Sequence, residues 1–444
     1  MSIEGNVAIV YPSYQAFKSK TKSLEWDVRW IQHGIASIIA YAKKEGIDVD
    51  LIDLRRLNDW DDFSSRIANY DIVAFSALTT DYPNTMKSIK ITKEQNPKTK
   101  VVVGGVHPSI ALEDFVNCKD IDFIVQGEGE IVFAELVKSI LSKKKCNRIV
   151  RGTPVINLDE IPFIDRTLWE RESPIGLKYK EPFVTILASR ACVYGCKFCQ
   201  PTARIIFGGR ERCRSVENVI AELIQLREQY HFNFFLVHDD NFLQNKEWCE
   251  KFVKQYKENS FDAEFMIQAR ADLICRHEDL VKKLAGIGLS YTFVGFESGS
   301  QRILNYIAKG TTVEQNIKSA KILKKYDVKI FANIMFGVPT ETREEAVQTE
   351  KMVDKIQPDH LSITYYTPYP GSFIADECKK NNLILVKEYD RMVRYPNEPK
   401  IKGIDYEFLD KIKQRMNVKH ALYNHNYLNF FWGLSRYFWQ TISL

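Results

Sequence analysis

Three cysteines lie close together near the middle of the chain, with C-x3-C-x2-C spacing over Cys192, Cys196 and Cys199. Thiolates are soft ligands that select zinc, copper(I) or iron–sulfur clusters. Gly195 permits a tight turn, which lets the three sulfurs converge. A β-branched run over 184–188 directly precedes them, so the cysteine loop is expected to follow a strand. The spacing therefore predicts a metal site.

The number of ligands separates the candidate metals. A structural zinc site closes with four ligands, yet no second C-x2-C or His-x3-His follows in the expected window, and Cys213 lies beyond a Gly208-Gly209 turn. A [4Fe–4S] cluster held by three cysteines keeps one iron open for a ligand or substrate. The iron–sulfur cluster is the favoured interpretation, and a closed zinc site or a disulfide pair are the alternatives.

The cysteine loop, with Phe198 just before its last cysteine, resembles the signature of the radical S-adenosylmethionine (SAM) superfamily. The resemblance implies reductive cleavage of SAM at the open iron to methionine and a 5′-deoxyadenosyl radical, which takes hydrogen from a substrate carbon. It also implies a low-potential electron donor of the flavodoxin or ferredoxin type. That step needs no general base, and no Ser-His-Asp or Cys-His set is recognisable, so no catalytic side chain is assigned.

The first 145 residues alternate short β-branched runs with helical patterns. The expected strands are at 7–11, 49–54, 72–76, 101–103 and 121–125, with helices at 31–45, 61–68, 83–96, 109–115 and 130–141. This alternation predicts a doubly wound, flavodoxin-like parallel sheet. Such sheets bind ligands outside the carboxyl ends of their strands, at the switch point of the strand order.

The loops at that edge contain paired glycines and hydroxyl side chains, which admit a bulky ligand to the backbone and can hydrogen-bond its amides or phosphate. The candidate ligand-binding residues there are Ser76, Thr79, Gly104, Gly105, Gly127 and Glu128. No G-x-G-x-x-G follows the first strand, so a dinucleotide site is weakly supported.

With Gly-Gly-Val-His-Pro at 104–108 and Gly-Glu-Gly-Glu at 127–130, residues 7–141 resemble the cobalamin (B12)-binding domain that precedes the barrel in cobalamin-dependent (class B) radical SAM enzymes. No Asp-x-His-x-x-Gly occurs, so the resemblance implies cobalamin bound base-off without a histidine ligand. His107 is expected to be a turn residue rather than a cobalt ligand. A flavodoxin-like domain with a purely structural role is the alternative.

Residues 146–180 are expected to form a linker, and residues 181–380 a partial (β/α)6 barrel of the TIM type, because six βα repeats follow one another there. In parallel barrels the chemistry lies at the carboxyl ends of the strands. Polar residues suited to the amine, carboxylate and ribose of SAM follow those ends, at Asp240, Gln268, Arg270, Glu297 and Ser298. The family resemblance implies that the second strand end contacts the amino group and that Glu297 and Ser298 contact the ribose. Thr342-x-x-Glu345 predicts a helix capping box.

Residues 381–444 are expected to form a helical C-terminal region that caps the substrate site or packs on the barrel. Its aromatic residues are Tyr423, Tyr427, Phe430, Phe431, Trp432, Tyr437, Phe438 and Trp439. Packing against the barrel, a lid over a bulky apolar substrate, and a peripheral membrane contact are all open.

Composition narrows the class of protein. The 444 residues carry a net charge of only +5, too little to predict nucleic-acid binding. The N-terminus lacks the basic and apolar regions of a signal peptide, and no run of 18 apolar residues occurs, so a cytoplasmic enzyme is expected.

The leading hypothesis is a radical SAM methyltransferase that uses a [4Fe–4S] cluster and cobalamin to methylate an unactivated carbon. A cobalamin-dependent radical SAM oxidoreductase or cyclase without methyl transfer, similar to the anaerobic cyclase of tetrapyrrole biosynthesis, is the alternative within enzymes. A zinc-stabilised binding module is the alternative from a different class. The sequence does not identify the substrate.

Overall fold

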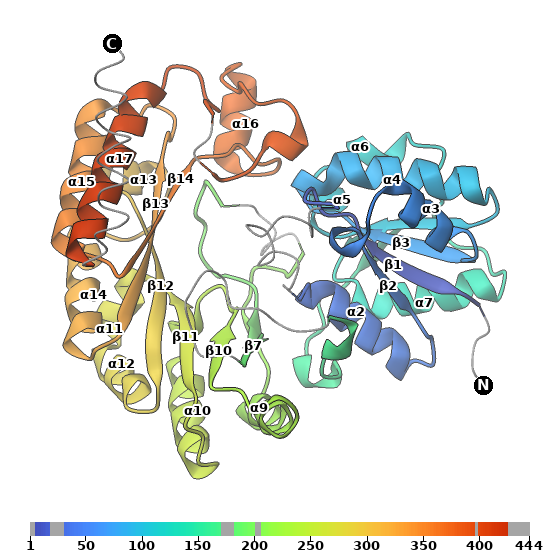
Figure 1. Ribbon diagram of the computed structural model, residues 1–444, viewed down its shortest axis with the longest axis horizontal. Coiled ribbons are helices and arrows are strands. Elements are labelled where there is room, and N and C mark those ends of the chain that lie inside the picture. Colours follow the sequence, from blue (N-terminus) through green and yellow to red (C-terminus); the bar gives the residue numbers. More distant parts are fainter. Residues whose placement is uncertain (1–4, 18–30, 170–181, 200–205, 396–397, 425–444) are drawn as a thin grey trace. The chain divides into compact units, whose positions relative to one another are not determined.

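The structure is a computed structural model that describes residues 5–17, 31–169, 182–199, 206–395 and 398–424 (Figure 1). The chain divides into two compact units. The first takes residues 1–193, 200–232 and 388–392, and the second takes 194–199, 233–387 and 393–444. The first unit therefore extends past the linker and includes the first strand and first helix of the segment that sequence assigns to the barrel.

The first unit contains a six-stranded sheet in the order β2-β1-β3-β4-β5-β6, and every neighbouring pair is parallel. The strands are β1 (Val7–Tyr11), β2 (Asp50–Asp53), β3 (Ile72–Ser76), β4 (Lys100–Gly104), β5 (Phe123–Gly127) and β6 (Ile149–Gly152). The strand order reverses direction between β1 and β3, which places the switch point at the loops that follow these two strands. The predicted flavodoxin-like topology is confirmed.

Helices cover both faces of this sheet because its strands are apolar on both faces. In β1, Val7 and Ile9 belong to the core that α2 (His33–Lys44) and α7 (Glu130–Leu141) cover. The alternate residues Ala8 and Val10 belong to the core under α3 (Trp60–Ile67) and α4 (Tyr82–Gln95). Successive side chains of a strand point to opposite faces, so one short apolar run supplies two cores.

Two local predictions for this sheet are wrong. Strand β6 lies in a segment that sequence analysis treats partly as linker, because its residues are only partly buried at the edge of the sheet and make no long apolar run. The helix predicted at 109–115 is two shorter helices, α5 (Val106–Ile110) and α6 (Glu113–Val116). Ala111 has an extended-type φ of −139° between them, which interrupts the helical backbone.

The second sheet also has six strands, in the order β14-β13-β12-β11-β10-β7, as expected for six βα repeats. The pairs from β10 to β14 are parallel. The strands are β7 (Phe183–Ile186), β10 (Phe234–Val237), β11 (Glu264–Ala269), β12 (Leu289–Glu297), β13 (Lys329–Phe336) and β14 (His360–Tyr365). The helices between successive strands are α9 (Val216–Tyr230), α10 (Lys246–Glu258), α12 (Glu278–Ala285), α14 (Val313–Lys325) and α15 (Arg343–Ile356).

Short elements follow the carboxyl ends of these strands, where the sequence places its polar clusters. Helices α11 (Ala271–Arg276) and α13 (Gln301–Tyr306) directly follow β11 and β12. The two-residue strands β8 (Ser189–Arg190) and β9 (Arg212–Cys213) form an antiparallel hairpin around the cysteine loop. Helix α16 (Phe373–Lys380) follows β14.

The described part of the C-terminal region packs on the second sheet's helical layer. Helix α17 (Tyr406–Tyr423) lies beside α15 (Figure 1), where Arg415 and Lys419 both bind the carboxylate of Glu350. The remaining aromatic residues of the tail, from Tyr427 to Trp439, lie outside the described residues. No helix among the described residues is long and apolar enough to cross a membrane.

Candidate cofactor sites

The three cysteines of the predicted metal site are reduced. Cys192 and Cys196 are partly buried and Cys199 is exposed. Across the described part of the chain, no three His, Cys, Asp or Glu side chains form a preformed metal site. The donor set still suits an iron–sulfur cluster, because three thiols within eight residues are held on one short loop and none is used in a disulfide.

Arg270 follows β11 and brings positive charge to Cys196. Its Nη1 lies 3.8 Å from Cys196 Sγ, and its guanidinium lies 3.5 Å from the ring centre of Tyr194. A 2.9 Å ion pair from Nε to Asp272 and a hydrogen bond to the Lys309 carbonyl oxygen fix its orientation. Arg270 is thus a buried donor group held beside one of the predicted metal ligands.

Lys309 is a second cation at this place, and sequence reasoning missed it. Its Nζ lies 3.0 Å from Glu297 Oε1, and both side chains are about nine-tenths buried. Burial by itself would lower the pKa of Lys309, but the Glu297 carboxylate and the Cys196 sulfur raise the pKa above its ordinary value. No pattern singles out Lys309, because it lies in an irregular loop after α13.

A backbone irregularity aims Glu297 at this lysine. The β12–β13 register shifts between Gly295 and Glu297, and Glu297 has a positive φ of 63°. A Cβ on Gly295 would lie 2.4 Å from Glu297 Oε1 and 2.9 Å from Lys309 Nζ, so a larger residue there would displace the ends of these two side chains. Non-glycine residues with positive φ cluster at functional sites, where the surrounding structure maintains the strain.

The other residues predicted to bind SAM divide into two groups. Asp240 is exposed after β10, and Gln268 is partly buried near the end of β11. Ser298, by contrast, is fully buried. Its hydroxyl lies 3.2 Å from that of Thr349 and accepts a hydrogen bond from the Ser300 N–H. In this structure the hydroxyl of Ser298 is therefore engaged by protein groups.

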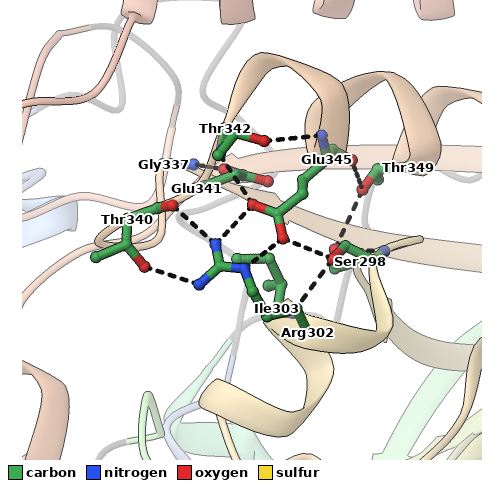
Figure 2. A network of polar contacts seen from close by, with 10 residues as sticks. Ser298, Arg302, Ile303, Gly337, Thr340, Glu341, Thr342, Glu345 and Thr349 are labelled. Carbon is green, nitrogen blue, oxygen red and sulfur yellow. Dashed lines mark hydrogen bonds and ion pairs between the residues drawn. The ribbon is translucent and has the colours of Figure 1, made fainter.

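Figure 2 shows the polar network that surrounds Ser298. The predicted capping box is confirmed: the Thr342 hydroxyl accepts from the Glu345 N–H, and the Glu345 carboxylate accepts from the Thr342 N–H. Burial would raise the pKa of Glu345, but hydrogen bonds from Arg302, the Thr342 N–H and Ser300 lower it to about 2. The network ties α13 to the start of α15.

Glu341 in the same network behaves in the opposite way. Its Oε2 accepts a hydrogen bond from the Gly337 N–H, while its Oε1 has no partner among the described residues. Burial raises the pKa of Glu341 to about 8. The carboxyl group is therefore protonated at neutral pH in the folded chain.

We expect Glu341→Gln to stabilise the protein at mildly alkaline pH. The unfolded chain releases the Glu341 proton near pH 4.5, whereas the folded chain holds it to about pH 8. The contribution of Glu341 to the free energy of unfolding is thus fully present below pH 4.5 and is lost as the pH rises toward 8. The amide has no proton to release, so the free energy of unfolding of the variant should exceed that of the wild type by about 4 kcal/mol near pH 8.

Urea unfolding of the wild type and the variant across this pH range measures the effect. Glu344→Gln is the matched control, because Glu344 is exposed in the first turn of α15, three residues after Glu341. The raised pKa of Glu341 would be contradicted if the difference in free energy of unfolding between Glu341→Gln and the wild type were the same at acidic and at alkaline pH.

The predicted cobalamin residues lie at the carboxyl ends of β3, β4 and β5, from the switch point outward along the first sheet. Ser76 ends β3, Thr79 is buried in the next loop, and Gly105 has a φ of +102° before α5. A Cβ on Gly105 would lie 2.9 Å from the backbone N and O of Ala77, so the two loops touch through their backbones. Gly104 ends β4, and Gly127 ends β5.

Asp81 is a further candidate at this edge. It is fully buried; its Oδ1 accepts from the Tyr14 N–H at 2.8 Å, and its Oδ2 has no partner among the described residues. Burial raises the pKa of Asp81 to about 6. A buried acceptor without a donor suits the amide N–H groups around a corrin ring, so the residues here fit cobalamin. The sequence marks Asp81 only as one residue of a polar loop.

His107 has a packing role. Its side chain is fully buried, with Nε2 3.1 Å from Asp114 Oδ2. Its ring makes edge-on contacts with those of Tyr82, Phe115 and Tyr389. Burial lowers the pKa of His107, so the imidazole is neutral near pH 7. These contacts agree with the expectation that it is a structural residue of the turn.

Glu128 is engaged by protein groups. Its carboxylate forms ion pairs with Arg190 and Arg212 and accepts a 2.7 Å hydrogen bond from the Val155 N–H. Its side chain is 1% exposed. The carboxylate of Glu128 is therefore used within the first unit, which leaves the backbone of its loop for a ligand.

Comparison with known proteins adds to this geometry. Residues 25–137 match the B12 binding domain family, and residues 186–353 match the radical SAM superfamily. The uncharacterized methyltransferase PH0819 of Pyrococcus horikoshii is 30% identical, over 88% of this chain and 87% of that protein. The anaerobic magnesium-protoporphyrin IX monomethyl ester cyclase of Rubrivivax gelatinosus is 27% identical, over 84% and 69%.

The fold is also found in a solved structure. The cobalamin-dependent SAM radical enzyme OxsB, with aqua-cobalamin and SAM bound, has a TM-score of 0.73. The match covers 94% of this chain and 68% of that one at 16% sequence identity, so it shows a common fold. The chain therefore belongs to the cobalamin-dependent radical SAM family, whose members are enzymes that use a [4Fe–4S] cluster, SAM and cobalamin.

Proposed function

We propose that this enzyme methylates an unactivated carbon, with SAM serving both as radical source and as methyl donor. The observation that carries the proposal is the pairing, in one chain, of a B12 binding domain and a radical SAM domain with a 30% identical relative named as a methyltransferase. The family assignment replaces the alternative of a zinc-stabilised binding module.

In this proposal, Cys192, Cys196 and Cys199 hold the cluster. Support comes from the absence of a disulfide among these three cysteines and from the two cations near Cys196, since Arg270 and Lys309 offset the negative charge that thiolate ligands bring. When bound, the cluster supplies the electron that cleaves SAM, and cobalamin carries the methyl group.

Arg270 and Glu297 orient SAM beside Cys196. The guanidinium of Arg270 is a donor suited to a carboxylate, and the Glu297 carboxylate is an acceptor suited to ribose hydroxyls. Lys309 holds Glu297 in place through their 3.0 Å ion pair. Asp240 remains the proposed contact of the SAM amino group, and Gln268 remains a proposed SAM contact. Ser298 acts on SAM through the backbone it supports in this proposal.

The switch-point loops of the first sheet hold cobalamin. Ser76 and Thr79 supply hydroxyls, and Gly104, Gly105 and Gly127 let the corrin approach the backbone. Asp81 adds a buried acceptor with one unpartnered oxygen. His107 is not assigned to cobalt in this proposal, because Asp114 and three aromatic rings hold its side chain.

The products of turnover test the proposal. The reconstituted enzyme, supplied with reductant, cobalamin and SAM bearing a deuterated methyl group, is incubated with a small-molecule extract of its source cells. We expect 5′-deoxyadenosine and S-adenosylhomocysteine in equal amounts, each equal to the deuterium-methylated product, because one SAM is cleaved and another donates its methyl. A labelled product without 5′-deoxyadenosine would contradict radical methylation.

A cyclase or oxidoreductase is a second candidate, favoured by the 27% identity to the magnesium-protoporphyrin cyclase over 84% of the chain. The same assay separates the two functions. The second function would be established if the substrate induced formation of 5′-deoxyadenosine but neither S-adenosylhomocysteine nor a deuterium-labelled product appeared. In that reaction the methyl group of SAM stays on methionine and is not transferred.

The partners follow from the same chemistry. The electron comes from a low-potential protein of the flavodoxin or ferredoxin type. The substrate is bulky and apolar in this proposal because the tail is rich in aromatic residues, and the same residues also suit a peripheral membrane contact. None of the nine cysteines forms a disulfide, which supports a reducing, cytoplasmic location.

A further inference from the structure

Two buried carboxylates connect a proposed cobalamin loop to the base of the cysteine loop. Glu130 Oε1 lies 2.6 Å from Arg190 Nη2, and Ser37 donates to the same oxygen at 2.8 Å. Glu128 pairs with Arg190 at 3.4 Å and binds Arg212 through both carboxylate oxygens. We call these five side chains the Glu–Arg clamp.

The two arginines of the clamp lie on the hairpin that flanks the cysteine loop. Arg190 on β8 pairs with Arg212 on β9, and Ser189 pairs with Cys213. The chain between the two strands is 191–211, which contains all three cysteines. The clamp therefore holds both ends of the cysteine loop at once.

The carboxylates themselves lie in residues 126–130, which run from the end of β5 to the start of α7 and pack closely against the end of β6. Gly127 has a φ of +84°, and a Cβ there would lie 2.5 Å from the Gly152 carbonyl oxygen. A Cβ on Gly152 would lie 1.7 Å from the Glu128 carbonyl oxygen. Residues 126–130, called loop 126–130 below, thus pack in direct contact with the end of β6. Because Glu128 and Glu130 form ion pairs with Arg190 and Arg212, a displacement of loop 126–130 would also displace these arginines.

We propose that Glu128 and Glu130 are positioning residues that couple cobalamin binding at loop 126–130 to the geometry of the cluster-bearing loop. The inference rests on the proposed function, because it needs a cluster on the cysteines and cobalamin at the switch point. A cluster orders the cysteine loop, and the clamp transmits that order to the loop that cobalamin contacts. Cobalamin then binds more tightly because less ordering remains to be done.

Absorption titration of hydroxocobalamin measures the coupling. The protein is titrated anaerobically with its cluster reconstituted and again after the iron has been removed by chelation. We expect the wild type with the cluster to bind hydroxocobalamin roughly 5- to 100-fold more tightly, a range typical of coupling between two sites. Reciprocity requires cobalamin to strengthen iron retention against a chelator by the same factor.

Glu130→Gln breaks the ion pair and keeps the side-chain shape. The variant should keep its iron and still bind hydroxocobalamin. Its affinity ratio, defined as the hydroxocobalamin affinity with the cluster divided by that without it, should fall toward one. Ser37→Ala weakens the same contact without leaving a buried charge unpaired, so it tests the coupling should Glu130→Gln fail to fold. Glu135→Gln is the matched control, because Glu135 is exposed on the same helix, and its ratio should equal that of the wild type.

The outcomes separate this inference from the proposed function. Wild-type protein that binds hydroxocobalamin equally well with and without the cluster would overturn the coupling and leave the two-cofactor enzyme intact. Wild-type protein that binds no hydroxocobalamin in either state would overturn the proposed function. A Ser37→Ala or Glu130→Gln protein with an undiminished ratio would show that the clamp does not transmit the coupling.

Discussion

Replacing Cys192, Cys196 and Cys199 together with alanine is expected to abolish iron binding and SAM cleavage. After anaerobic reconstitution, the wild type should carry about four irons per chain, and the triple variant almost none, because thiolates are the ligands that hold such a cluster. Corrinoid should still bind at saturating hydroxocobalamin, since its proposed site lies on the first sheet, with the weaker affinity that the Glu–Arg clamp predicts for protein without a cluster. Iron, sulfide and cobalt analyses beside the absorption spectrum measure this result.

A single-cysteine variant outside the loop controls for nonspecific iron binding. Cys275 is partly buried on α11, and its Sγ lies 3.4 Å from the Gln315 carbonyl oxygen, so Cys275→Ala should retain the full iron content. Full iron content in the triple variant would show that the cluster is held elsewhere. Complete loss of cobalt together with iron would show that cobalamin binding depends on the cluster more strongly than the affinity change expected from the Glu–Arg clamp.

Glu222→Ala is expected to cost about 3 to 5 kcal/mol in the free energy of unfolding. Glu222 on α9 is buried; its Oε1 accepts from Arg166 at 3.0 Å, and its Oε2 accepts from Arg214. The side chains of these arginines are 5% and 13% exposed. Removal of the carboxylate leaves two guanidiniums in a low-dielectric region without the charge that compensates them.

Urea unfolding followed by circular dichroism measures the loss. Glu228→Ala, at an exposed position of the same helix, should change the free energy of unfolding by less than about 0.5 kcal/mol. Glu222 is outside the proposed cofactor contacts, so Glu222→Ala should still bind the cofactors under conditions in which it is folded. A loss for Glu222→Ala as small as that of the control would show that water reaches the arginines and replaces the carboxylate.

The sequence predicts most of the fold because its signals are local. The five apolar runs of the first sheet are strands in the structure, and the order β2-β1-β3 gives the switch point that a doubly wound sheet requires. The predictions fail at an edge strand whose residues are only partly buried. Strand β6 is half-exposed at an edge, and its short segment lacks the apolar pattern of an inner strand.

The sequence proposes ligands for the site, whereas the residues that support those ligands came only from the structure. Arg270 and Glu297 follow strand ends, and the structure gives both a place near Cys196 or Lys309. Ser298 also follows a strand end, yet its hydroxyl is buried against Thr349. Position after a strand does not reveal which way a side chain points, because a single shift in register reverses it.

The sequence by itself determined the family, the cofactors and the alternation of strands and helices, since motif spacing and hydrophobic period are properties of neighbouring residues. Only the tertiary structure decided the partners of the buried charges. Lys309 with Glu297, Asp81 with its unpartnered oxygen, and Glu130 with Arg190 depend on contacts between distant parts of the chain. Charges so far apart in sequence leave no local pattern, because the low-dielectric interior that makes their pairing matter exists only after folding.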